Sequence, residues 1–258
     1  MKVAVVTAYW RDDAAYFDRC IASVRDQDAK VTHIVVADGC ELPHTKTDTA
    51  GVRIIHLPHN YHDSGNTPRL HGCNAAMQEG FDAIAFLDAD CWYHPRHISS
   101  LLESHSVTGA LVGASQRMIC GLDGSPVGIC LLSGTPQFAD TSCMIWFGEA
   151  MRHGLHWGAI PYEFHTIGDR IVWKQISDQR VSRCFTSRPT VGYTAKHERF
   201  YERVGLPVPH GTRKHTGTGV AVRKYRDQYG VDLSISWALA AWSQLSAEQR
   251  ASWTIGAE

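Results

Sequence analysis

Several features that would assign a function at once are missing from this chain of 258 residues. Its eight cysteines include no Cys-x-x-Cys pair, which argues against a zinc ribbon or a dithiol redox motif. No stretch approaches the ~20 apolar residues that cross a membrane. The formal net charge of -1 at pH 7 gives no general attraction for nucleic acid or anionic lipid. With these classes disfavoured, a globular α/β enzyme or binding domain is the remaining expectation.

The cysteines also indicate a compartment. Several lie in apolar runs, as Cys130 does within residues 127–132, and this is typical of buried reduced thiols. Residues 1–7 are expected to form a strand, because their apolar stretch is too short for an export signal. We therefore expect a cytoplasmic protein without an integral membrane segment.

Apolar runs and helical periods alternate along the first hundred residues. Continuous apolar runs predict buried strands, and helices are indicated by apolar spacing, by Thr67-Pro68 as a helix start and by Gly80 as a helix stop. The order is typical of a parallel sheet flanked by helices. The expected strands span residues 3–6, 34–37, 52–57 and 82–87, and the expected helices span residues 17–24 and 67–79 and follow Pro95.

The second half is less regular. The apolar pattern predicts strands at residues 111–115 and 127–132, joined by a turn at residues 121–124, and a helix that begins near Gly168-Asp169. Residues 207–219 are expected to form a loop rich in glycine and basic residues. A final amphipathic helix is expected to contain Ala238, Ala241, Trp242 and Leu245.

The most informative motif is Asp88-Ala89-Asp90, at the end of the fourth expected strand. Side chains at positions i and i+2 of an extended segment point to the same side, so the two carboxylates lie together. A hard divalent cation, manganese or magnesium, is their natural partner and could bridge a diphosphate. Thr7 and Asp38 also follow strands, where open α/β sheets bind ligands.

Three segments in this order resemble the nucleotide-binding half of GT-A-fold glycosyltransferases, most of all the inverting family 2. They are Thr7-Ala8-Tyr9-Trp10-Arg11, Ala37-Asp38-Gly39 and Leu87-Asp88-Ala89-Asp90. The resemblance covers about residues 1–105. It implies a Rossmann-like, mostly parallel sheet flanked by helices, with an irregular acceptor-side second half. It also implies metal-dependent transfer of a sugar from a nucleotide diphosphate donor, a UDP-sugar, to an acceptor hydroxyl with inversion.

The same resemblance implies one catalytic domain over residues 1–205. Residues 1–105 would be its nucleotide-binding half and residues 106–205 its acceptor-side half. Residues 206–258 would form a C-terminal loop and helix that pack on this domain. Contact with a second copy in a homodimer, or with a membrane, is a lesser alternative for the last helix.

The resemblance assigns roles on the donor side. Asp38 would accept a hydrogen bond from N3 of uracil, and Asp90 would bind the metal together with Asp88. Two simpler interpretations stay open, because Asp38-Gly39 also suits a turn and Arg69 a solvated helix position. Asn60 or Asp63 could touch the nucleotide. The donor-binding residues that it implies are Thr7, Tyr9, Arg11, Asp38, Arg69, Asn74 and Asp88.

On the acceptor side, residues 166–173 resemble the acidic helix start that carries the catalytic base. Gly168 replaces the first acid of that pattern, so Asp169 is the leading base and Glu163 the second candidate. Asp169 as a simple helix cap is the alternative.

A late histidine often completes the metal site in this fold. Gly192-Tyr193-Thr194-Ala195-Lys196-His197 resembles that position, and it makes His197 the third metal ligand. His210 and His215 are rivals. We also expect Arg213, Lys214 and His215 to form a lid over the diphosphate.

Other functions stay open. A sugar nucleotidyltransferase is disfavoured, because residues 7–13 contain no glycine for a phosphate loop. A non-catalytic nucleotide-sugar-binding module would keep Asp38 and Asp90 but need no base, and a hydrolase using the histidines would need no nucleotide. The sugar and the acceptor are unknown: a glycan, lipid, protein, small molecule or modified nucleic acid would each suit. The absence of a Gln-x-x-Arg-Trp motif argues against a processive polysaccharide synthase.

Overall fold

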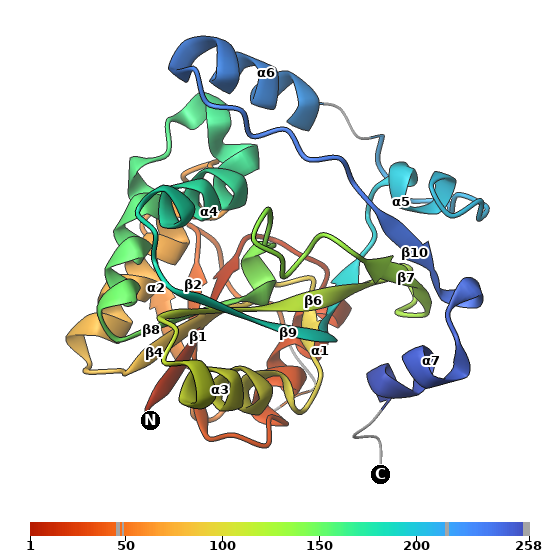
Figure 1. The fold of residues 1–258 in the computed structure, drawn as a ribbon. Coiled ribbons are helices and arrows are strands. Elements are labelled where there is room, and N and C mark those ends of the chain that lie inside the picture. Colours follow the sequence, from red (N-terminus) through yellow and green to blue (C-terminus); the bar gives the residue numbers. More distant parts are fainter. Residues whose placement is uncertain (45–46, 48, 215–216, 255–258) are drawn as a thin grey trace.

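The computed structural model describes residues 1–44, 47, 49–214 and 217–254. Within them, one mixed sheet runs through the centre of the molecule, with helices on both sides (Figure 1). The strands are β1 (Val3–Tyr9), β2 (Val31–Ala37), β3 (Arg53–His56), β4 (Ala83–Phe86), β5 (Trp92–Tyr93), β6 (Val112–Cys120), β7 (Pro126–Cys130), β8 (Met144–Phe147), β9 (Arg183–Thr194) and β10 (Leu239–Ala241). The helices are α1 (Ala14–Arg25), α2 (Asn66–Gln78), α3 (His97–Thr108), α4 (Gly168–Asp178), α5 (Glu198–Glu202), α6 (Thr218–Tyr229) and α7 (Ala247–Thr254), with 3-10 turns η1 (Thr141–Cys143), η2 (Gly148–Ala159), η3 (Tyr162–Ile167) and η4 (Trp242–Gln244).

The sheet changes character between its two halves. Strands β3, β2, β1 and β4 are neighbours in that order and all run parallel. Beyond them β8 lies antiparallel between β4 and β6, and β9 pairs parallel with β6 and antiparallel with β5. Strand β7 and then β10 extend the far edge. The parallel half therefore brings the ends of β1, β2 and β4 to one edge.

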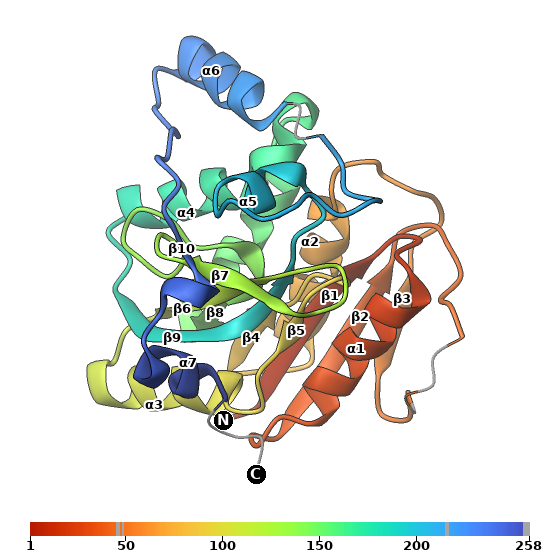
Figure 2. The same ribbon diagram turned by 90° about the vertical axis from the view of Figure 1, so that its right-hand side faces the viewer.

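Both faces of β1, β2 and β4 are largely buried, which explains their continuous apolar runs. Ala4 and Val6 face a core formed with α2, η2 and α4. Val3 and Val5 face the opposite core, formed with α1 and α3. Figure 2 shows the same arrangement from the side. The α/β fold expected from the sequence, with its central sheet flanked by helices, is confirmed.

Two local expectations were wrong. The helix predicted around residues 238–245 is strand β10 followed by η4, because the backbone of Leu239 pairs with Cys130 at the sheet edge. Thr67 is not the N-cap of α2. Gly65 occupies that position, and the Asp63 carboxylate accepts a hydrogen bond from the Thr67 backbone N–H at 2.8 Å.

The C-terminal part of the chain returns to the body of the protein twice. Helix α6, which the sequence analysis did not predict, packs on η3 through Ala221 and Val222. An extended segment then leads from α6 to β10 (Figure 1). None of the helices in the described ranges is long and apolar enough to cross a membrane.

Gly39 lets two loops approach closely at the edge where β2 ends. Its φ is +65°, and a Cβ built there would lie 2.2 Å from the carbonyl carbon of His59 and 2.3 Å from the backbone nitrogen of Asn60. Backbone atoms cannot move aside as a flexible side chain can. Any larger residue at position 39 therefore displaces the loop that follows β3.

We predict that Gly39→Ala destabilises the protein by about 1 kcal/mol more than Gly80→Ala does. Both residues have positive φ and share the cost of ~1–2 kcal/mol for a side chain in that region, but a Cβ at Gly80 meets nothing within 4 Å. Urea unfolding of both variants measures the difference. Equal losses in free energy of unfolding would contradict the close approach.

Candidate active site

A cavity of about 540 Å³ opens at the edge where β1, β2 and β4 end. This is the position where open α/β sheets bind ligands. Its walls come from six parts of the chain: residues 8–12 at the end of β1, Asp38 after β2, residues 60–69 around the start of α2, residues 88–90 after β4, Tyr162 and Arg213. We call it the first cavity.

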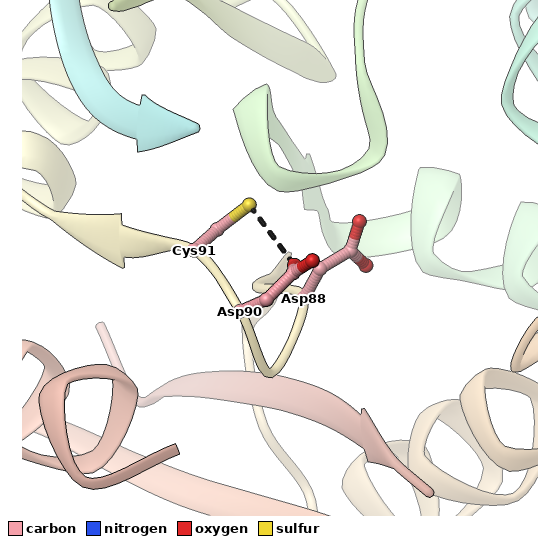
Figure 3. Close-up of side chains that lie close together, drawn as sticks. All are labelled: Asp88, Asp90 and Cys91. Atoms are coloured by element: carbon pink, nitrogen blue, oxygen red, sulfur yellow. Dashed lines mark hydrogen bonds between the residues drawn. The ribbon is translucent and has the colours of Figure 1, made fainter. Parts of the chain in front are cut away.

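Asp88 and Asp90 form the acidic part of this cavity. Figure 3 shows the turn that follows β4, with the Cys91 thiol directed at Asp90. The ligand atoms of these three residues all lie within 4.8 Å of one another. Burial raises the pKa of the Cys91 thiol well above its usual value, so the thiol stays protonated and is a poor ligand. The carboxylate oxygens are the groups that suit a hard cation.

Each of the two aspartates already has a cationic partner. Arg69 Nη2 lies 2.6 Å from Asp88 Oδ1, and Arg69 Nη1 also donates to the Ser64 carbonyl at 2.9 Å. Lys196 Nζ lies between Asp90 Oδ2, at 2.7 Å, and Asp12 Oδ1, at 2.8 Å. Burial alone would lower the pKa of Lys196, but the two carboxylates raise it above its usual value. The ammonium group is therefore a fixed positive charge at this site.

The floor of the cavity holds Asp38 and Tyr9. Asp38 is only 3% exposed, and its Oδ1 accepts the Tyr61 backbone N–H at 3.1 Å. Burial raises the pKa of this carboxyl. Burial also raises the pKa of Tyr9 to about 12, and its hydroxyl donates to the Asp12 carbonyl. Arg11, at the cavity rim, has an unusual φ of +48°.

Two expected donor-binding residues lie elsewhere. The Thr7 side chain is fully buried and hydrogen bonds to His33 Nε2 at 2.8 Å. Thr7 and Tyr9 face the same side of β1, because they are two residues apart. Thr7 lies inside the strand against α1, whereas Tyr9 is the last residue of the strand and lines the cavity. Asn74, on α2, is not among the residues that line the first cavity.

A second cavity of about 340 Å³ adjoins the first, and Ser64 lines both. Asp169 reaches it from the first turn of α4 and accepts the Arg170 backbone N–H at 2.8 Å. Burial raises the pKa of the Asp169 carboxyl, which makes it a better proton acceptor near neutral pH. Glu163 is exposed on η3 and lines neither cavity.

The late histidine and the lid segment lie beside these cavities. His197 lines the second cavity rather than joining the group of Asp88, Asp90 and Cys91. Burial lowers the pKa of its imidazole, which favours the neutral form. Arg213 lines the first cavity, and its backbone N–H donates to the Lys196 carbonyl at 2.7 Å. Lys214 and His210 are exposed, and His215 lies outside the described residues.

Residues 3–139 match the family model described as "Glycosyl transferase family 2". This chain belongs to glycosyl transferase family 2. Its fold resembles residues 1–349 of TarS from S. aureus, with a TM-score of 0.54 and 15% identity over 78% of this chain and 63% of that one. The complex of the same TarS fragment with UDP-GlcNAc gives a TM-score of 0.54 and 14% identity over 98% and 78% of the two chains.

The chain covers only part of the TarS chains that it resembles. This family 2 chain spans 63% of TarS 1–349 and 38% of a longer TarS structure. The TarS fragment has also been crystallised with UDP, and that structure is 17% identical to this chain. Likeness at this level of identity establishes the fold. No curated protein sequence matches the chain.

Four charged residues of this family 2 chain were not expected from the sequence. Asp12, which lines the first cavity, pairs with Lys196, and buried Arg117 pairs with Asp140 in the second cavity. Burial raises the pKa of Asp140 to about 6 although Arg117 opposes the shift. A charged residue inside the apolar pattern of β6 was the one available signal for Arg117, because such a residue needs a buried partner. Nothing local distinguishes Asp12 or Lys196.

We predict that Lys196→Met tightens Mn²⁺ binding by about tenfold. Removing the ammonium group frees Asp90 and Asp12 from a competing cation, and a unit charge at ~4 Å is worth about 1–4 kcal/mol near a protein surface. Calorimetric titration of MnCl₂ measures the affinity. Lys174→Met, which removes an exposed lysine paired with Asp178, is the control. Unchanged or weaker Mn²⁺ binding in Lys196→Met would exclude competition at this site.

Proposed function

We propose that this chain transfers a sugar from a UDP-sugar to an acceptor hydroxyl, with the help of a divalent cation. The observation that carries the proposal is the first cavity. It joins a buried carboxylate, Asp38, to the Asp88–Asp90 pair and Arg69 at the end of the parallel strands. Asp38 would bind the nucleoside of the donor, and the Asp88–Asp90 pair with Arg69 would lie at its diphosphate.

Asp38 supports uracil as the base. Its Oδ1 is engaged by the Tyr61 backbone N–H, while a carboxylate has acceptor capacity on both oxygens. Uracil carries an N–H at N3, and cytosine does not. The TarS fragment, similar in fold, was crystallised with UDP and with UDP-GlcNAc. A uridine nucleotide is therefore the donor class that we propose.

The charges of the first cavity support a divalent cation. Five carboxylates and three guanidinium groups line it, and the Lys196 ammonium group pairs with two of the carboxylates, so its excess charge is still negative. An anionic diphosphate needs additional positive charge to bind there. Asp88 and Asp90 would hold manganese or magnesium, which would neutralise the charge of the departing diphosphate. Arg69 and Arg213 would lie beside the phosphates, with Arg213 as the part of the lid that reaches the cavity.

The second cavity supports an acceptor site with Asp169 as base. The acceptor oxygen would attack the anomeric carbon as the bond from that carbon to the diphosphate breaks, and UDP would leave. Asp169 would take the proton of the acceptor hydroxyl. Attack from the side opposite UDP inverts the anomeric configuration.

Eight free thiols, seven of them buried, support a reducing cytoplasm.

We predict that Asp169→Asn lowers transfer by at least about 10²-fold, within the range for loss of a general base, and leaves the affinity for UDP unchanged. Glu163→Gln, which alters an exposed acid outside both cavities, should retain full activity. Release of UDP from UDP-GlcNAc and other UDP-sugars, with Mn²⁺ and a panel of acceptors, measures turnover. NMR of the product reports its anomeric configuration.

Three results would argue against these assignments. Normal turnover in Asp169→Asn would exclude Asp169 as the base. A loss of turnover in Glu163→Gln would indicate that Glu163 is the base. Tight UDP binding without turnover of any donor would support the non-catalytic module instead.

A further inference from the structure

The second cavity is unusual in its charge. Three arginines line it, Arg117, Arg170 and Arg199, against two carboxylates, Asp140 and Asp169. Its excess charge is therefore positive, whereas that of the first cavity is negative. The two cavities adjoin at Ser64, so the change of sign occurs over a short distance.

Two of the three arginines have partners within the protein. Arg117 is buried and ion-paired with Asp140. Arg170 donates from Nη1 to the Leu233 carbonyl at 3.0 Å, and the neighbouring carboxylate of Asp169 acts on it electrostatically. The charges of these two side chains are thus compensated by fixed groups.

Arg199 differs from both. Its guanidinium carbon lies 5.6 Å from the ring centre of Trp237 and 5.0 Å from that of Phe200. In the described part of the chain it forms no ion pair with a carboxylate. The positive charges of Arg117, Arg203 and Arg170 lie near enough to act on it. At neutral pH the Arg199 guanidinium group is positively charged, and three other arginines are close to it.

An uncompensated, half-buried cation is costly unless an anion reaches it. The cavity that Arg199 lines is open to ligand and has aromatic walls in Phe138, Tyr193 and Trp237. Its volume lies near the lower end of small-molecule sites, which suits one unit of an acceptor. Asp169 lines the same cavity.

We propose that the acceptor carries an anionic group, a phosphate or a carboxylate, that binds Arg199 in the second cavity. The hydroxyl that receives the sugar lies towards Asp169. This inference rests on the proposed function, since it names the acceptor class of the same site. The opposite charges of the two cavities then separate the substrates: the cation-bound diphosphate enters the first, and the anionic acceptor enters the second.

The test uses the full chain saturated with UDP, without added metal, and inorganic phosphate or acetate as the probe. The indole N–H signal of Trp237, assigned with Trp237→Phe, reports binding beside Arg199 in ¹H–¹⁵N NMR spectra. Sodium chloride at matched ionic strength is the reference. Arg199→Gln is compared with Arg203→Gln, which removes an exposed arginine just beyond the same helix.

The proposal predicts a saturable shift of the Trp237 signal in the wild type and in Arg203→Gln. In Arg199→Gln the apparent affinity should fall at least tenfold. A response to phosphate and not to acetate assigns a phosphate, and the reverse assigns a carboxylate. No shift beyond that of chloride, or an unchanged affinity in Arg199→Gln, would overturn the proposal.

A separate titration of UDP keeps the two proposals distinguishable. Arg199→Gln should bind UDP as the wild type does, because Arg199 does not line the first cavity. If UDP binds neither the wild type nor the variants, the proposed function is wrong. The anion titration, repeated without UDP, still decides whether Arg199 binds an anion.

Discussion

The structure depends on the repulsion among three carboxylates, Asp12, Asp88 and Asp90, that the ends of β1 and β4 bring together. Each close pair of like charges costs about 1–4 kcal/mol at ~4 Å near a protein surface. Two cations from distant parts of the chain compensate it: Arg69 on α2 and Lys196 after β9. The site therefore ties the end of the irregular second half to the parallel half. Any ligand must fit into a network in which two cations oppose three carboxylates.

The two adjoining cavities differ in the sign of their charge. The first cavity is left with excess negative charge and the second with excess positive charge, and Ser64 lies between them. A cation-bound diphosphate suits the first cavity and an anion suits the second. Asp169, whose pKa is raised by burial, lines the second cavity. In the proposed reaction, the leaving group and the proton acceptor would therefore lie in different cavities.

The sequence predicted the parallel half well because its signals are local. Residues 3–6 and 34–37 are apolar on both faces, and Gly80 ends α2, with no need of distant partners. The second half depends on long-range pairing: β10 forms only because β7 offers an open edge, so its apolar spacing was mistaken for a helix. The site divides in the same way. Asp38 and Asp88 follow strands and were expected there, whereas Lys196 is recognisable only once β9 has carried it to Asp12.

Calorimetric titration of UDP into the protein, once with MnCl₂ and once with EDTA, tests the central claim most directly. The account predicts one molecule of UDP bound per chain with Mn²⁺, and an affinity at least about tenfold weaker in EDTA, since a cation at Asp88 and Asp90 would neutralise the diphosphate. An absence of UDP binding under both conditions would contradict it.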